Sequence, residues 1–247
     1  MAVYNVHGGH NAKVPGASKY LNEVTEDRKV KERVIALLRQ QGHTVYDCTD
    51  DAGTTQSKNL ANIVAKCNQH NVSLDISIHL NAGGGTGVEV LYYSAAGKTY
   101  AKKISAAVAK KLGLTDRGAK QRTGLYVLRN TRSTAVLVEC CFVDSANDKK
   151  KWNADTCAQA IVEAVTGTTA STDVSSGNTS GAFLVKIKAA DLTIRSGAGM
   201  SYQAVGHITD KGTYTITQVQ YNGSTPWGRL KSGAGWISLH TAYVTRL

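Results

Sequence analysis

The fold of this chain is decided by the stretch Val72-Ser73-Leu74-Asp75-Ile76-Ser77-Ile78-His79-Leu80-Asn81. Its aliphatic residues alternate with polar or ionisable ones. Strict alternation is typical of a β-strand, in which successive side chains point to opposite faces. We therefore expect Asp75, Ser77 and His79 to share the polar face of a strand, with His79 near the end of that strand.

A second run, Ala135-Val136-Leu137-Val138-Glu139, is apolar until its last residue. An uninterrupted apolar run is typical of a central strand that is buried on both faces. Because isolated burial of a charge is costly, Glu139 is expected to have a partner or a chemical task.

The start of the chain predicts a third strand over residues 2–6, followed by the loop His7-Gly8-Gly9-His10. The carboxyl ends of strands in an open α/β sheet line one crevice, so side chains from distant segments can meet there. A single histidine is more often solvated than a ligand. His10 and His79 at two strand exits, with Glu139 at a third, instead predict a metal site beside a carboxylate.

Strand-like and helix-like segments alternate up to about residue 166. Apolar residues recur at helical spacing in 30–38, 60–67, 100–112 and 158–165, and strand-like runs include 43–46 and 88–93. This alternation predicts an α/β domain over residues 1–166, with a mostly parallel twisted sheet flanked by helices on both faces.

The composition changes between residues 167 and 181, a Ser/Thr/Gly tract with almost nothing that could pack. Such a tract is typical of a flexible linker. Residues 182–247 then contain short strand-like runs separated by turn residues, which predict a small all-β barrel. These runs are 183–187, 192–195, 204–208, 214–219, 227–230 and 235–239.

Composition limits the class of protein and its partners. The chain has 247 residues, 42% of them hydrophobic, which is enough for a real core, and its net charge of +11 favours polyanionic surroundings. No nucleic-acid-binding motif occurs, and the basic residues are scattered or lie on helix faces, so no nucleic acid partner is expected. No apolar stretch is long enough for membrane insertion, and the first residues lack a secretory signal, so we expect synthesis in the cytoplasm without a signal peptide.

The five cysteines form an odd set without the paired spacing of a zinc ribbon. We expect reduced, mostly buried thiols. The adjacent pair Cys140-Cys141 is interpreted as two small core residues rather than as a nucleophile.

Six short motifs follow one another along the first domain: Gly9-His10, Asn22-Glu23, Ser77-Ile78-His79-Leu80-Asn81, Gly87-Val88-Glu89-Val90, Asp116-Arg117-Gly118-Ala119-Lys120 and Ala135-Val136-Leu137-Val138-Glu139. In this order and spacing they resemble the zinc-dependent N-acetylmuramoyl-L-alanine amidases of bacterial autolysins and phage endolysins.

In that family two histidines and a glutamate bind zinc, and a second glutamate assists catalysis. The resemblance implies His10, Glu23 and His79 as the ligands of Zn²⁺, and Glu139 as the catalytic acid/base. Two imidazoles and one carboxylate leave a fourth tetrahedral position for water, which is typical of a catalytic rather than a structural zinc site.

Two alternatives remain open for the ligands. His7 competes with His10, although Gly9-His10 fits the family better. Glu26 competes with Glu23, because either could lie in the first turn of its helix and be stabilised by the helix dipole alone. We prefer Glu23, because its separation from the helix-ending Gly42 matches the family.

Residues 182–247 resemble bacterial SH3-like cell-wall-binding domains through Leu192-Thr193-Ile194-Arg195-Ser196-Gly197-Ala198-Gly199 and Gly235-Trp236-Ile237. The aromatic side chains of such a small barrel can simply fill its core. Tyr202 and Tyr221 are candidates for stacking on sugar or peptide if they are exposed.

Together the two resemblances imply an endolysin-like hydrolase whose partner is bacterial peptidoglycan. It would cleave the amide bond between N-acetylmuramic acid and L-alanine with zinc-activated water, after release from the cell, while the barrel keeps it on the wall. Two alternatives are a zinc peptidase that cuts within the peptide stem or cross-bridge, and a noncatalytic wall-binding protein. The substrate-binding residues and the oligomeric state are not predicted.

Overall fold

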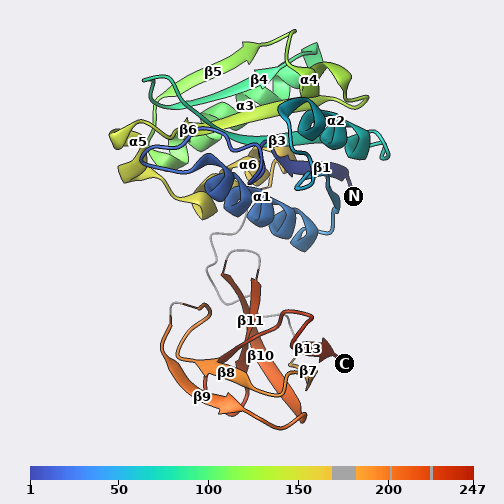
Figure 1. Cartoon of the computed structure of the whole chain (residues 1–247), viewed down its shortest axis with the longest axis vertical. Helices are drawn as coiled ribbons and strands as arrows, with labels where there is room; N and C mark the ends of the chain where they lie inside the picture. The colour runs from blue at the N-terminus through green and yellow to red at the C-terminus, as the bar shows by residue number, and fades with distance from the viewer. Residues whose placement is uncertain (169–181, 201, 223–224) are drawn as a thin grey trace. The chain divides into compact units, whose positions relative to one another are not determined.

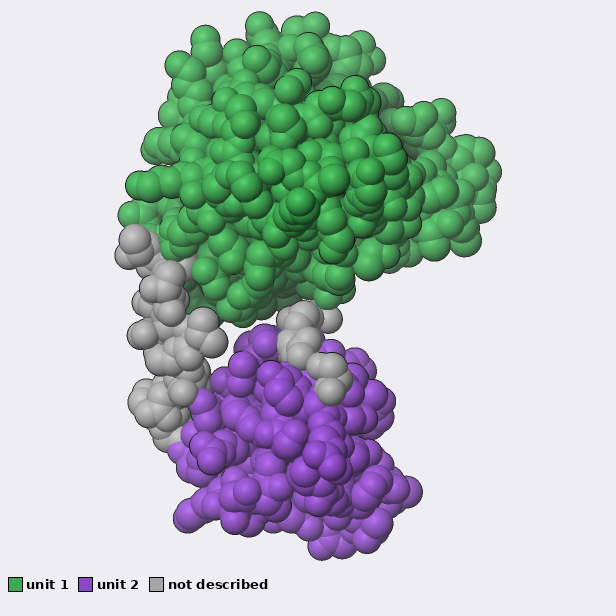
Figure 2. Space-filling view, turned by 90° about the vertical axis from the view of Figure 1, so that its left-hand side faces the viewer, with its two compact units in different colours: residues 1–170 green, residues 171–247 purple. Residues whose placement is uncertain are grey.

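The structure is a computed structural model of the chain, and it describes residues 1–168, 182–200, 202–222 and 225–247. The chain divides into two compact units, Met1–Ala170 and Ser171–Leu247, which are coloured separately in Figure 2. From residue 169 onward, the predicted linker 167–181 lies outside the described residues.

The first unit is built on a six-stranded sheet with the order β2-β1-β3-β6-β4-β5 (Figure 1). Four of its five strand pairs are parallel, and only β4 and β6 run antiparallel to each other. The mostly parallel sheet of the sequence prediction is therefore confirmed. The strands are β1 (Val3–Gly8), β2 (Thr44–Asp47), β3 (Leu74–Asn81), β4 (Val88–Tyr92), β5 (Asp116–Gln121) and β6 (Ala135–Phe142).

Helices cover both faces of this sheet, as predicted. The helices are α1 (Glu23–Gln40), α2 (Gln56–Cys67), α3 (Ala95–Leu112), α4 (Tyr126–Asn130), α5 (Ala146–Lys151) and α6 (Ala154–Thr166). Val136 and Val138 of β6 pack in the large core that α1, α3 and α6 share. Leu137, between them, packs instead with Leu128 of α4, which is the alternation of a strand buried on both faces.

Two elements differ from what the sequence pattern suggested. The segment 116–121 carries motif residues but almost no apolar alternation, and yet it forms the edge strand β5. The apolar segment at 125–128, which the sequence analysis assigned to neither a helix nor a strand, contributes to the short helix α4. None of the residues of β5 is fully buried on either face, so period-two hydrophobicity does not mark this edge strand.

All five cysteines are buried and free, which confirms the prediction of reduced core thiols. Cys140 and Cys141 are both fully buried, and burial raises the pKa of the Cys141 thiol. A thiol in such surroundings is not an activated nucleophile.

The second unit contains a seven-stranded sheet with the order β13-β7-β10-β11-β12-β8-β9. All of its strand pairs are antiparallel, so the all-β expectation for this region holds. The strands are β7 (Phe183–Ile187), β8 (Leu192–Arg195), β9 (Ala204–Ile208), β10 (Thr213–Asn222), β11 (Thr225–Leu230), β12 (Trp236–Ser238) and β13 (Val244–Arg246). An aliphatic core around Ile187, Ile216 and Ile237 holds them together.

Among the described residues, none of the helices combines the length and the apolar character that crossing a membrane requires.

Candidate metal centre

Three metal-binding side chains from separate segments meet at the carboxyl end of β3. His10 lies in the loop after β1, Glu23 is the first residue of α1, and His79 lies near the end of β3. One ligand atom from each of the three lies within 4.8 Å of the others. The structure thus brings together the three residues that the family resemblance implied.

Glu23 lies between the two imidazoles. Its Oε1 is 3.1 Å from His79 Nδ1 and 3.5 Å from His10 Nε2. The backbone N–H of Ala17 donates to Oε2 at 2.8 Å, and that of Leu80 donates to Oε1 at 3.1 Å. These bonds hold the carboxylate in one orientation, which a metal ligand requires.

The start of α1 places Glu23 at this position. Asn22 caps the helix, because its side chain accepts a hydrogen bond from the backbone N–H of Thr25 at 2.9 Å. An acidic residue in the first turn is also favoured by the helix dipole. Local sequence therefore fixes where the helix begins and makes Glu23 its first residue.

Two glycines allow the backbone to approach the three donors closely. A Cβ atom added to Gly9 would lie 1.8 Å from the ring of His79, and one added to Gly16 would lie 2.0 Å from Glu23 Oε2. Any side chain at either position would push a donor out of place. Gly16 is a site residue that the sequence analysis missed, and its only signal is its place in the loop after His10.

A charged network fixes the loop that carries His10. Arg28 donates to the carbonyl oxygen of His10 at 2.5 Å and to Asp51 at 2.7 Å, and it also pairs with Asp27 at 3.0 Å. Burial raises the pKa of Asp27 to about 7, although the neighbouring Arg28 opposes that shift. Arg28 therefore ties the His10 loop both to α1 and to Asp51.

Burial and mutual charge set the protonation of the three donors. Burial would raise the pKa of Glu23, but hydrogen bonding to His79 and the two nearby histidines bring it below its usual value. Burial likewise opposes the charge on His79, yet Glu23 and Glu139 raise its pKa overall. Burial and the proximity of His79 lower the pKa of His10. These pKa shifts favour the ionised carboxylate of Glu23, the neutral imidazole of His10 and the protonated imidazole of His79.

Glu139 lies beside this cluster. It is the register partner of His79 across the parallel β3–β6 pair, so the two side chains project from the same face. Burial raises the pKa of Glu139 to about 7, with Glu23 and Glu89 adding to the effect and His79 opposing it. Its Oε2 atom is buried without a hydrogen-bond partner in the described structure, as expected of a carboxylate with a task to perform.

The two alternative ligands lie outside the cluster. His7 is fully buried within β1, and burial and the proximity of His79 lower its pKa to about 3, so its imidazole stays neutral. Glu26 accepts a hydrogen bond from Trp152 Nε1 at 2.8 Å and pairs with Lys29 at 2.7 Å. Neither residue belongs to the group of donors found among the described residues.

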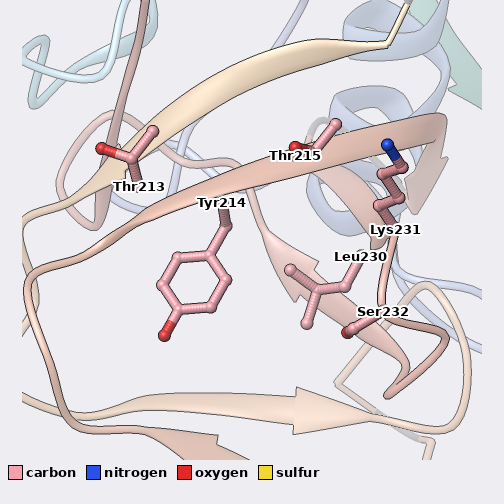
Figure 3. Close-up of a pocket in the computed structure, with 6 residues that line it drawn as sticks. All are labelled: Thr213, Tyr214, Thr215, Leu230, Lys231 and Ser232. Carbon is pink, nitrogen blue, oxygen red and sulfur yellow. The ribbon is translucent and has the colours of Figure 1, made fainter.

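The second unit has a pocket beside its core, formed by β10 and the end of β11. Its lining residues are Thr213, Tyr214, Thr215, Leu230, Lys231 and Ser232. Figure 3 shows the Tyr214 ring on one side of β10 and the two threonines on the other. The Tyr214 hydroxyl donates to Asp210 at 2.5 Å. Lys231 is the charged side chain in this lining.

Comparison with known proteins identifies the family. Residues 6–169 match the family described as N-acetylmuramoyl-L-alanine amidase. This chain belongs to that amidase family. The matched range contains His10, Glu23, His79 and Glu139, and it corresponds to the first unit.

This amidase-family chain is also similar in sequence to individual proteins. It is 37% identical over 150 residues to an uncharacterized protein of Clostridium perfringens, covering 58% of this chain and 44% of the relative. It is 31% identical over 162 residues to the N-acetylmuramoyl-L-alanine amidase CwlM of Bacillus licheniformis, covering 62% and 61%. The chain thus spans less than two thirds of the length of these relatives.

A solved structure has the same fold. The catalytic domain of the CD27L endolysin targeting Clostridia difficile superposes with a TM-score of 0.63 at 29% identity. The match covers 68% of this chain and 98% of that domain.

Proposed function

We propose that this protein is a zinc-dependent peptidoglycan hydrolase that cleaves the amide bond between the lactyl group of N-acetylmuramic acid and L-alanine. The observation that carries the proposal is the convergence of His10, Glu23 and His79 next to Glu139 in a chain of the amidase family. Three donors and a neighbouring buried carboxylate are the parts that metal-assisted amide hydrolysis requires.

The donor set fits Zn²⁺. Two imidazoles and one carboxylate are common zinc ligands, and a set of three leaves one tetrahedral position open. Gly9 and Gly16 keep the space around the donors free of side chains. When bound, zinc would supply Lewis-acid polarisation of the amide carbonyl and would acidify water.

Within this mechanism, Glu139 has the role of acid/base. Its carboxylate accepts the proton of the attacking water and delivers it to the nitrogen of the leaving L-alanine. Burial raises the pKa of Glu139 to about 7 in the metal-free site, and a bound divalent cation nearby would lower it and favour the carboxylate that accepts the proton of water. Glu23 holds the two imidazoles, and Arg28, paired with the buried Asp27, keeps the His10 loop in position.

The second unit is proposed to be an SH3-like domain that keeps the enzyme on the cell wall. Its antiparallel strands and aliphatic core support this proposal. Tyr202 and Tyr221 are both exposed and so could stack on sugar or peptide. We further propose that the protein is made in the cytoplasm and reaches the wall on release, as an endolysin does.

The decisive experiment is the digestion of purified peptidoglycan. Cleavage at the proposed bond frees the amino group of L-alanine and creates no new reducing sugars. Mass spectrometry of the fragments locates the cut. New reducing ends would mean glycosidase action and would overturn the proposal, while fragments cut within the stem or cross-bridge would assign the protein as a peptidase.

A noncatalytic wall-binding protein would give a third result. Wild type and Glu139→Ala would then both bind cell walls in the presence of zinc, and neither would clear them.

A further inference from the structure

Beyond Glu139, a row of paired residues continues across the sheet of the first unit. Glu139 is in register with His79 on β3 and with Glu89 on β4. Glu89 is in turn in register with Gly118 on β5, where the register shifts by one residue between Val88 and Glu89, and Arg117 is the extra residue of this β-bulge. Register partners project from the same face of a sheet, so the row leads from the metal donors to the edge strand.

Glu89 holds Arg117 at the end of this row. Arg117 Nε donates to Glu89 Oε2 at 2.8 Å, while Asn81 Nδ2 donates to Glu89 Oε1 at 3.1 Å. The guanidinium carbon also lies 5.0 Å from the centre of the Phe142 ring. An ion pair on one side and an aromatic ring on the other restrict the guanidinium to one orientation.

Arg117 keeps unused hydrogen-bonding capacity. Glu89 is buried at 7% exposure, whereas 38% of the Arg117 side chain is exposed. The ion pair uses only Nε, and neither terminal nitrogen has a hydrogen-bond partner among the described residues. An oriented guanidinium with two free nitrogens is suited to bidentate binding of a carboxylate.

We propose that Arg117 binds a carboxylate on the peptide arm of the substrate and thereby determines specificity. This inference rests on the proposed function, in which the peptide arm begins at the scissile amide beside Glu139. Neighbouring strands are about 4.8 Å apart, so Glu89 lies one strand step from Glu139 and β5 lies two. Because the Arg117 guanidinium reaches back from β5 to Glu89, it can meet the second or third residue of an extended peptide. The other charged groups in the row are Glu139 and Glu89, which repel a carboxylate.

The glutamyl residue that follows L-alanine in wall peptides provides the probe. Its α-carboxyl group is either free or present as the carboxamide. Charge-assisted hydrogen bonds are roughly twice as strong as neutral ones, so we expect wild type to favour the free acid about tenfold. The preference should lie in KM, because Arg117 contacts the peptide away from the scissile bond.

The experiment compares two soluble muramoyl peptides that end in L-alanyl-D-glutamyl with the γ-carboxyl capped as a methylamide. They differ only at the α-carboxyl group, which is the free acid in one and the carboxamide in the other. KM and kcat are measured for both, together with the calorimetric Kd of the two free dipeptides. The variants are Arg117→Gln, Arg117→Lys and the double variant Glu89→Gln/Arg117→Gln. Lys120→Gln is the matched control, since Lys120 is an exposed cation on the same strand.

The double variant separates substrate binding from neutralisation of Glu89, because removing Arg117 alone leaves a buried carboxylate unpaired. We expect the acid preference to disappear in Arg117→Gln and in the double variant, to survive in part in Arg117→Lys, and to be unchanged in Lys120→Gln. A double variant that regains the wild-type preference would overturn the inference, and so would equal wild-type KM and Kd values for acid and amide.

The dipeptide Kd separates this inference from the proposed function. Wild type that prefers the acid dipeptide in binding but cleaves neither muramoyl peptide supports the role of Arg117 and refutes the amidase. Wild type that cleaves both muramoyl peptides equally supports the amidase and refutes the role of Arg117.

Discussion

The two units of this chain differ in what they bury. Among the described residues, every buried polar or charged side chain except Ser238 belongs to the first unit. The second unit is held by an almost purely aliphatic core. Burying polar groups is costly unless they are paired, so a fold retains them where they are needed for chemistry. The buried polar groups thus lie in the unit that carries the candidate metal centre.

Removal of the metal should have the largest effect and should be confined to the first unit. We expect a zinc chelator to abolish hydrolysis and to lower the thermal stability of the first unit, because the two histidines and Glu23 lose their common partner. Zinc at 1,000 times its Kd would restore about 4 kcal/mol. Calorimetry with and without zinc follows the transitions of both units. Full activity in metal-free protein would contradict the proposal.

Glu139→Gln should lower kcat by about 10²- to 10⁴-fold, because the amide cannot transfer the proton. Metal content should not change, since Glu139 is not one of the three donors. Kinetics on a soluble muramoyl peptide and metal analysis test both statements. Glu26→Gln is the matched control, because Glu26 bonds to Trp152 and Lys29 and should leave kcat near the wild-type value.

Ile216→Ala tests the second unit separately. Ile216 is fully buried in its core, and loss of such a side chain costs about 2–5 kcal/mol. We expect urea unfolding of the second unit to shift accordingly, while kcat on a soluble substrate stays the same and retention on cell walls falls. A matching loss of kcat would mean that the chemistry depends on the second unit.

Asp75→Asn should stabilise the first unit in a pH-dependent way. Burial raises the pKa of Asp75 to about 6, against 3.8 for an unperturbed carboxyl, so its ionised form opposes folding. The stability linked to its protonated form is complete below about pH 4 and is lost as the pH rises through 6. Above that pH the loss is about 3 kcal/mol.

Urea unfolding is measured at pH 4 and pH 7 for wild type and Asp75→Asn, with hydrogen exchange of the β3 amides as the probe of the first unit. The variant should exceed wild type at pH 7 and approach it at pH 4. Asp155→Asn, at an exposed position on α6, serves as the control and should show no such gap. A difference in unfolding free energy between variant and wild type that is the same at both pH values would contradict the raised pKa of Asp75.

Much of the fold could be predicted from the sequence, because hydrophobic periodicity reports which faces are buried. The alternation at residues 72–81 gives a strand at Leu74–Asn81, and the apolar run before Glu139 gives a strand buried on both faces. The exposed edge strand β5 and the antiparallel direction of β4 were not predicted. Strand direction depends on the path of the connecting chain, which periodicity does not describe.

The residues of the candidate site could likewise be predicted only in part from the sequence. Family motifs pointed to His10, Glu23, His79 and Glu139, but local pattern alone could not separate His10 from His7 or Glu23 from Glu26. The structure separates them in space, because His7 is buried inside β1 while Glu26 bonds to Trp152. The ligand roles themselves remain predictions until a metal is measured.

The sequence by itself determined most of the strands and helices, the division of the chain into two parts of different composition, and the residue types that could carry chemistry. Only the tertiary structure decided which of those residues meet, such as Glu89 with Arg117 and Gly16 with Glu23. The physical reason is one of distance. Patterning acts through neighbours a few residues apart, whereas a site forms from groups that strand pairing brings together from distant parts of the chain.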